Sequence, residues 1–203
     1  TGLAQLEELR NVEATARGQI SCILQLRLHD AIAALREKVE QNDRHYEVVL
    51  TYITARGRWY FESWKGDTGK SGGVALNIGI HFFDMLGFIF GELKGSRVHH
   101  RNPQTAAGAL EFERASVRWF MSIDASSLPE VAVDKGQRTY RSITVDGDEI
   151  EFSEGFTDLH TRSYERILAG DGFGLDEVEA SIRLVEEINT ATISSDDDRH
   201  PFL

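Results

Sequence analysis

The chain is short of cysteine: Cys22 is the only one in 203 residues. A single cysteine cannot form a disulfide within the chain, and this usage is typical of the reducing cytoplasm. No uninterrupted apolar run reaches the about 18 residues of a membrane helix, because Asn77, His81 and Asp84 break the most apolar segment, residues 74–90. No charged leader with an apolar core opens the chain. We therefore expect a cytoplasmic protein that has no membrane partner.

Basic residues are also scarce. Lys and Arg number 22 against 33 Asp and Glu, which gives a formal net charge of -11. Binding to the nucleic-acid backbone needs a basic face, so we expect no nucleic-acid partner. One local exception is the basic loop, residues 56–70, which contains Arg56, Arg58, Lys65 and Lys70. Composition alone leaves open whether this loop binds an anionic ligand or is a solvated surface segment.

The chain has no phosphate-binding P-loop, although GDTGKSGG at 66–73 looks similar to one. In the motif G-x-x-x-x-G-K-[ST] the first glycine gives the loop room to wrap around phosphate. Counting back from Gly69, that position holds Trp64, and the preceding residues are aromatic and charged rather than a buried strand. The spacing excludes a P-loop nucleotidase. No dinucleotide-binding G-x-G-x-x-G occurs either.

Residues 1–44 have the pattern of a parallel α/β domain. Leucines and a valine at three-residue steps predict a first amphipathic helix that ends at Gly18. ISCILQLRL at 20–28 predicts a buried strand, and 30–41 predicts a second helix capped by Asp30. This helix–strand–helix order occurs once and stops. It suggests the end of a domain whose first part is missing.

Residues 45–203 have the pattern of an α+β domain. Strand-forming residues fill 45–57, and 108–124 alternates in polarity with a break near Arg114, as in a hairpin. A second hairpin is predicted at 138–154, which contains an Asp-Gly turn. Two helices follow, at 157–169 and 174–191. We expect a mostly antiparallel open sheet with helices on one face. Its other face, with the apolar residues of 108–124, would join subunits into a homodimer or homotetramer.

A polar stripe marks the apolar helix that follows Gly72 and Gly73. Asn77, His81 and Asp84 stand at i, i+4 and i+7 among Val, Leu, Ile and Phe. Such a stripe is costly unless each group has a partner. Two interpretations stay open: a core histidine held by Asp84, or a cleft in which His81 meets a substrate hydroxyl. A metal site is disfavoured, because asparagine is a poor ligand and no Cys or His cluster lies nearby in the sequence.

The stretch GGVALNIGIHFFD at 72–84 resembles the G-G-x-x-x-D-x-G-x-H-x-x-D signature of the Gfo/Idh/MocA oxidoreductase family. The wider stretch 56–86 resembles the branch of that family that oxidises UDP-N-acetylglucosaminuronic acid at C3 in lipopolysaccharide and O-antigen sugar biosynthesis. LQLRLH at 24–29 and residues 155–174 are similar to the same branch. The resemblance covers nearly the whole chain and implies an NAD-dependent sugar-nucleotide dehydrogenase with a UDP-sugar substrate.

The resemblance also implies a missing part. Family members have an N-terminal Rossmann domain with a glycine fingerprint and a Glu-Lys-Pro segment whose lysine is catalytic, and this chain has neither. We expect residues 1–44 to be the C-terminal remnant of that domain and 45–203 to be the substrate-binding and oligomerisation domain. NAD would be bound mainly by the missing domain, so no cofactor-binding residue is assigned here. The chain alone would be inactive.

Four residues take their roles from the resemblance. His81 stands at the position of the family's active-site histidine, close to the hydroxyl that is oxidised. Asn77 replaces the usual aspartate; it cannot act as a base but can orient the sugar or His81. Arg27 and His160 lie in segments similar to the family's substrate side. For these last two, a structural or surface role stays open.

The basic loop supplies the other candidates. Arg58, Lys65 and Lys70, with the backbone amides of 71–73, would neutralise a diphosphate, or they are loop charges without a ligand. Aromatic residues of the same loop would stack on uracil or sugar, or pack beneath it; these are Trp59, Tyr60 and Trp64. Two alternatives to the main function remain. One is another sugar or polyol dehydrogenase, whose neutral substrate would not need the basic loop. The other is a non-catalytic binding or oligomerisation domain.

Overall fold

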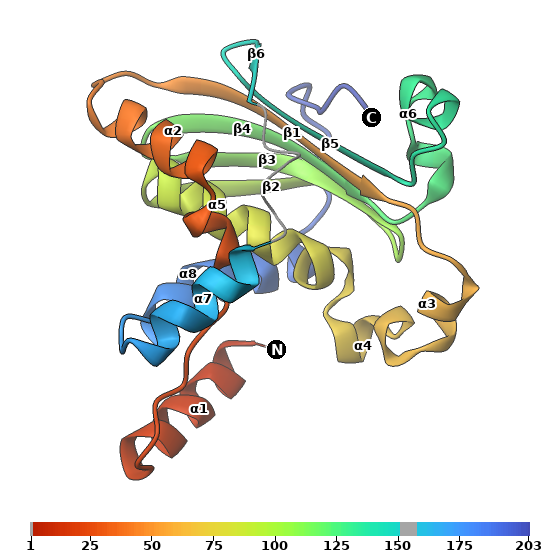
Figure 1. Cartoon of the computed structure of the whole chain (residues 1–203). Coiled ribbons are helices and arrows are strands. Elements are labelled where there is room, and N and C mark those ends of the chain that lie inside the picture. The colour runs from red at the N-terminus through yellow and green to blue at the C-terminus, as the bar shows by residue number, and fades with distance from the viewer. Residues whose placement is uncertain (1, 151–157) are drawn as a thin grey trace.

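A single six-stranded mixed sheet organises the protein (Figure 1). The computed structural model describes residues 2–150 and 158–203. The strands follow the order β2-β3-β4-β1-β5-β6. Their bounds are β1 Tyr46–Thr54, β2 Leu93–Arg101, β3 Thr105–Phe112, β4 Ala115–Ser122, β5 Thr139–Val145 and β6 Asp148–Glu149. Neighbouring strands are antiparallel except β1 and β4, which are parallel. The predicted α+β class with a mostly antiparallel open sheet is confirmed.

The longer helices gather on one face of this sheet (Figure 1). Their bounds are α1 Leu3–Thr15, α2 Asp30–Glu40, α3 Arg58–Glu62, α4 Thr68–Ser71, α5 Ile80–Phe90, α6 Glu130–Asp134, α7 Leu159–Leu168 and α8 Leu175–Thr190. α5 lies against the sheet with α2 and α8 packed on it (Figure 1). The short α6 lies on the other side of the sheet, beside β5 (Figure 1). α1 lies farther from the sheet and packs on α8, where Leu6 joins a small apolar cluster with Leu175 and Ile182.

Both predicted hairpins form within the described residues, and residues 151–154 of the second lie outside them. In the first, Leu110 of β3 pairs with Val117 of β4, so both side chains lie on the helix-covered face. The second turns at Asp146 and Gly147, with φ of 53° and 88°. A two-residue turn with positive φ at both positions matches the twist of the strands, and Asp-Gly tolerates it well. The alternating polarity and the Asp-Gly turn therefore predicted correctly which neighbouring segments pair in the sheet.

The predicted strand at 20–28 is wrong. Within it, the backbone pairs only at Cys22, which forms an isolated bridge with Phe173, and Gln25–Leu28 is a 3-10 helix. Leu24, Leu26 and Leu28 are buried while the residues between them are not. This alternation is the pattern of a β-strand, and it misled the prediction because no neighbouring strand of the described sheet pairs with the segment. The cap of the next helix also differs: the His29 side chain, not Asp30, accepts the N–H of Ala31. The first helix ends at Thr15, before Gly18.

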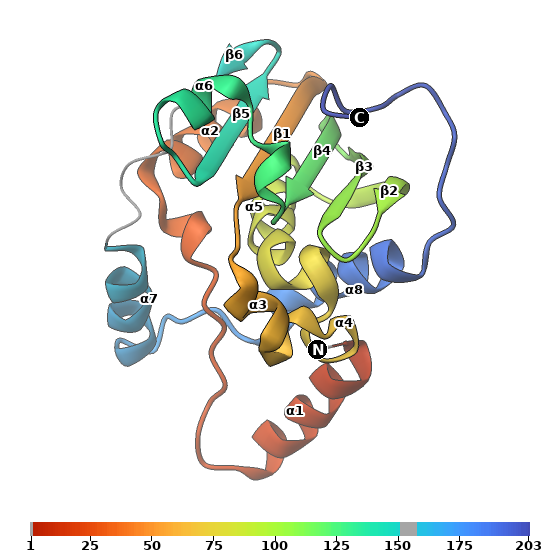
Figure 2. The same ribbon diagram turned by 90° about the vertical axis from the view of Figure 1, so that its right-hand side faces the viewer.

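The face opposite the helices is more polar than expected. Within 108–124, Leu110, Val117 and Trp119 point toward the helices and belong to the main core. The opposite face carries the charges of Glu111 and Arg118 and a small apolar cluster of Ile53, Ala107 and Phe120. The C-terminal segment leaves α8, passes β2 and crosses this face, as Figure 2 shows. The residues expected to make the open face apolar therefore lie in the core, and the C-terminal segment covers the apolar cluster that this face does carry, with His200 and Phe202 against Phe120.

The apolar helix begins after Gly72 and Gly73, which both have positive φ. Residues Ala75–Gly79 form a π-helical turn that continues into α5. Gly79 fits there because an added Cβ would lie 2.9 Å from the sulfur of Met121 on β4. By length and composition the stretch Thr68–Phe90 could cross a membrane, and 61% of its apolar window is buried inside the protein. Buried core helices pass the same test.

Candidate active site

A cavity of about 440 Å³ lies beside the first turns of the apolar helix. Its walls are mostly leucine, isoleucine and valine side chains from α1, α8 and residues 20–24. Its polar groups come from the basic loop and the helix: Trp64, Lys70, Ser71, Asn77 and His81. An apolar cavity with a few converging polar groups is typical of a small-molecule site. The helix thus brings Asn77 and His81 to one site, as the stripe predicts.

Asn77 is held by a partner in the basic loop. Its Nδ2 donates to the Tyr60 hydroxyl at 2.6 Å. Tyr60 is only 4% exposed, and burial raises the pKa of its phenol, while Asn77 and the charge of Arg56 act in the opposite direction. The phenol therefore stays neutral at physiological pH. Because its amide is tied to Tyr60, Asn77 presents a fixed polar group to the cavity.

His81 is partly buried and uncharged at neutral pH. Burial lowers the pKa of its imidazole; the charge of Asp84 opposes this shift and that of His160 adds to it. Among the described residues no hydrogen bond involves the His81 ring. A neutral imidazole without an internal partner can accept a proton from a bound hydroxyl. The alternative of a core histidine hydrogen-bonded to Asp84 finds no support in this geometry.

Asp84 instead binds Arg27. The guanidinium reaches the carboxylate with Nε and Nη2, at 2.9 Å and 2.6 Å. Nη2 also donates to the Glu177 carbonyl at 3.1 Å, and the guanidinium lies over the rings of Phe88 and Phe173. Arg27 does not line the cavity. Its geometry matches a structural role linking residues 25–28 to α5.

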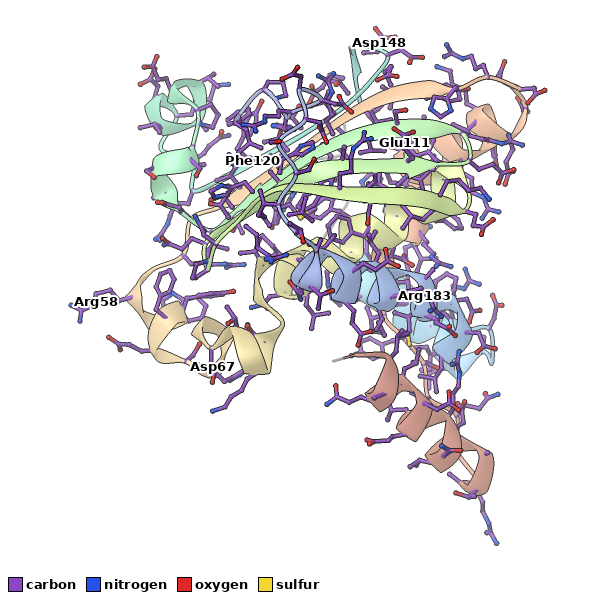
Figure 3. The ribbon with its side chains drawn as sticks, turned by 180° about the vertical axis from the view of Figure 1, so that it is seen from behind. Arg58, Asp67, Glu111, Phe120, Asp148 and Arg183 are labelled. Atoms are coloured by element: carbon purple, nitrogen blue, oxygen red, sulfur yellow. The ribbon has the colours of Figure 1, made fainter. Side chains whose placement is uncertain are left out.

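The three cations predicted to bind the diphosphate differ in whether they line the cavity. Lys70 lines it, although its side chain is 70% exposed and lies 3.6 Å from Asp67. Arg58 does not line it; its side chain is 95% exposed, pairs with Glu62 at 3.5 Å and points away from the protein (Figure 3). Lys65 lies over the ring of Trp64. Of the three predicted diphosphate ligands, only Lys70 is at the cavity.

His160 lies on α7, near enough for its charge to act on His81. Its side chain is exposed, and α7 packs against residues 25–28. The structure thus groups Asn77, His81 and Lys70 at the cavity and leaves His160, Arg27 and Arg58 outside its lining. Within the described ranges 2–150 and 158–203, no group of three or more His, Cys, Asp or Glu could hold a metal ion.

The sequence did not identify Tyr60 as the partner of Asn77. The two residues are 17 positions apart, and α3 and α4 fold between them. The only available signal was a tyrosine in a loop before the signature, which equally suited stacking on a ligand. Tertiary packing of the basic loop decides its role.

The chain is similar to known oxidoreductases. Residues 36–149 match the model of an oxidoreductase family's C-terminal alpha/beta domain, GFO_IDH_MocA_C. The WlbA (WbpB) dehydrogenase of Thermus thermophilus, solved with NAD and alpha-ketoglutarate, is 51% identical with a TM-score of 0.92, over 98% of this chain and 65% of that one. Its complex with NAD and UDP-GlcNAcA gives 50% identity and a TM-score of 0.91, over 98% and 65%.

More distant structures share the fold. WlbA of Bordetella pertussis, solved with NADH and UDP-GlcNAcA, is 18% identical with a TM-score of 0.71, over 91% of this chain and 64% of that one. The chain thus spans 65% of the length of the Thermus relative. The family model covers more than half of the chain, and the signature it contains lies on the helix that carries His81. The protein therefore belongs to the Gfo/Idh/MocA oxidoreductase family.

Proposed function

We propose that this chain is the substrate-binding part of an NAD-dependent dehydrogenase. The enzyme oxidises the C3 hydroxyl of UDP-N-acetylglucosaminuronic acid in lipopolysaccharide and O-antigen sugar biosynthesis. One observation carries the proposal: a neutral His81, which makes no hydrogen bond through its ring among the described residues, lines a cavity in a chain half identical to a WlbA dehydrogenase solved with NAD and UDP-GlcNAcA. The other ligand reported for that relative, alpha-ketoglutarate, shares carboxylate chemistry with the uronic acid sugar.

In this proposal His81 takes the proton of the sugar hydroxyl, because burial keeps its imidazole neutral and no partner within 2–150 and 158–203 competes for it. Asn77 orients the sugar, with its own amide tied to Tyr60. Lys70 at the cavity neutralises part of the diphosphate. Arg27 supports the helix through Asp84. Lys65, Arg58 and, when protonated, His160 add positive charge outside the cavity. NAD supplies the hydride acceptor.

NAD does not fit the described residues by themselves. The sequence has no G-x-G-x-x-G, and the described sheet has no strand that leads through a glycine-rich turn into a helix. We therefore propose that NAD is bound mainly by a preceding Rossmann domain. Residues 1–44 would be the end of that domain, and 45–203 the substrate-binding and oligomerisation domain.

We also propose that the protein is cytoplasmic and forms a homodimer or homotetramer. The sheet face opposite the helices, together with the C-terminal segment that crosses it, would form the contact (Figure 2). Light scattering should give a mass above that of one chain at high concentration. A monomer mass would count against this part of the proposal.

Calorimetric titration of the chain tests the function. UDP-GlcNAcA should bind with a Kd in the micromolar to millimolar range, and myo-inositol at the same concentrations should give no heat. Binding of myo-inositol alone would favour another polyol dehydrogenase. No binding of either would favour a non-catalytic domain. NAD should give no signal, and micromolar NAD binding would contradict the assignment of the cofactor to another domain.

A further inference from the structure

Arg56 carries a buried polar atom that has no partner. The residue lies two positions after the end of β1, and its backbone N–H donates to the Ile123 carbonyl at 3.0 Å, which fixes its position at the sheet end. Its side-chain Nε is buried without a hydrogen bond, and no ion pair involves its guanidinium among the described residues. A buried donor without an acceptor costs free energy. Arg56 therefore has the properties of a residue whose partner is a ligand.

Three other arginines of this region, unlike Arg56, form ion pairs among the described residues. Arg27 is bound by Asp84, Arg58 pairs with Glu62, and Arg162 pairs with Asp30 at 3.0 Å. The chain has 33 acidic residues against 22 basic ones, so carboxylates are not scarce. A guanidinium that stays unpaired and partly buried in such a protein is available to an external anion.

Arg56 is also close to the cavity. Its charge acts on the phenol of Tyr60, whose hydroxyl binds Asn77 at 2.6 Å. Asn77 in turn lines the cavity together with His81. Tyr60 and Asn77 thus connect Arg56 to the cavity, although Arg56 is not among the residues that line it. A ligand in the cavity would have to reach past Asn77 to meet the guanidinium.

On the basis of the proposed function, we propose that Arg56 binds the carboxylate of the uronic acid sugar. The planar fork of a guanidinium matches a carboxylate with two parallel hydrogen bonds, and it stays charged at every relevant pH. Lys70 at the cavity is a point charge and suits the diphosphate. Arg56 then makes the site selective for the uronic acid over the corresponding sugar with a neutral CH₂OH group.

The test compares Arg56→Met with Arg138→Met as a matched control. Arg138 is exposed, its carbonyl accepts the N–H of Ala55, and among the described residues its side chain makes no ion pair. Both variants remove one positive charge from the same end of the sheet. Affinity for UDP-GlcNAcA and for UDP-GlcNAc is measured by calorimetry on each protein.

Arg56→Met should bind UDP-GlcNAcA roughly 10–100-fold more weakly than the original protein, because it loses hydrogen bonds to a charged group. Its affinity for UDP-GlcNAc should stay within about threefold of the original. Arg138→Met should change neither. An equal loss for both nucleotides would assign Arg56 to the diphosphate and overturn the proposal, and unchanged affinity for both would overturn it as well. The melting temperature of Arg56→Met should not fall below that of Arg138→Met, because no internal partner is lost.

A second probe separates this inference from the proposed function. Free glucuronate carries the carboxylate without a nucleotide, and the buried Nε–H of Arg56 can be followed by nitrogen-15 NMR. Its resonance should move with added glucuronate and stay unmoved with added glucose. If UDP-GlcNAcA fails to bind but glucuronate moves the resonance, the proposed function fails and the carboxylate site stands. If glucuronate leaves it unmoved, the carboxylate site is wrong.

Discussion

Arg27 and Asp84 form a two-point pair, with Nε to Oδ2 at 2.9 Å and Nη2 to Oδ1 at 2.6 Å. The pair joins residues 25–28 to α5, the helix that begins one residue before His81. Burial raises the pKa of Asp84, and Arg27 opposes that shift. Because the Asp84 carboxylate is engaged by Arg27, His81 is left without a hydrogen-bonded partner in the described residues. The pair therefore supports the site without being part of its chemistry.

Arg27→Met should destabilise the chain by about 3–5 kcal/mol, because it leaves a buried carboxylate unpaired. The Asp84 side chain is only 3% exposed. The loss should shrink on acidification, since protonation removes the uncompensated charge. Urea unfolding at neutral and acidic pH measures it. The control is Arg183→Met, which breaks an exposed pair with Glu179 and should cost less than about 1 kcal/mol. Equal losses in the two variants would contradict the role of Arg27.

Asn77→Asp should raise the pKa of His81. In the original protein burial lowers that pKa, and a carboxylate at position 77 on the same cavity favours the imidazolium. A proton NMR titration of the histidine ring measures the change in the chain as it is. Asn42→Asp, at an exposed site after α2, should leave the His81 titration in place. A His81 pKa that falls or stays constant in Asn77→Asp would show that the two side chains do not share the cavity.

Tyr60→Phe should release the amide of Asn77, because it removes the hydroxyl bound at 2.6 Å while keeping the buried ring. We expect a loss of about 0.5–1.5 kcal/mol in unfolding free energy and weaker binding of UDP-GlcNAcA. Chemical denaturation and calorimetry measure the two effects. Tyr164→Phe, at a site 58% exposed, should change neither. Unchanged ligand affinity in Tyr60→Phe would mean that Asn77 needs no orientation by this hydroxyl.

His200 should make the chain less stable in acid. It is 2% exposed against Phe120, and its pKa is lowered to about 4, mainly by burial and further by Arg118. Its Nδ1 accepts the N–H of Phe202 at 3.1 Å, so Nε2–H of the neutral ring donates to Thr51. Protonation at Nδ1 would break the first of these bonds.

The sign follows from the lowered pKa. The folded chain binds this proton more weakly than the unfolded chain, so the stability is present above the unfolded pKa near 6.5 and is lost as pH falls toward about 4. Between pH 7 and 5 the loss from this group is about 2 kcal/mol. Urea unfolding should show a smaller loss in His200→Gln than in the exposed control His45→Gln. Identical pH dependence in both variants would exclude His200 as the cause.

Local signals in the sequence predicted much of this fold. Asp146 and Gly147 mark a turn with positive φ, and the break near Arg114 marks the hairpin of β3 and β4. The stripe of Asn77 and His81 was correct because one helix presents both to the cavity. Each of these features depends on residues that are neighbours in the chain.

Features that depend on distant packing could not be predicted. β2, LKGSRVHHR, has few apolar residues and pairs as an edge strand, so no alternation indicated it. Residues 20–28 alternate in burial but find almost no strand partner. The partner of Arg27 is 57 residues away, and nothing in the local pattern connects it to Asp84. The sequence of the segment after α8 has no pattern that indicated its packing across the sheet.

Replacement of His81 by Asn, in the protein completed with its N-terminal domain, tests the central claim most directly. The readout is NADH formation from UDP-GlcNAcA per folded molecule, together with the melting temperature. If His81 takes the proton of the hydroxyl, turnover should fall by about 10²–10⁴-fold while the melting temperature and NAD affinity hardly change. Near-normal turnover with a clearly lowered melting temperature would contradict the account and leave His81 as a structural residue.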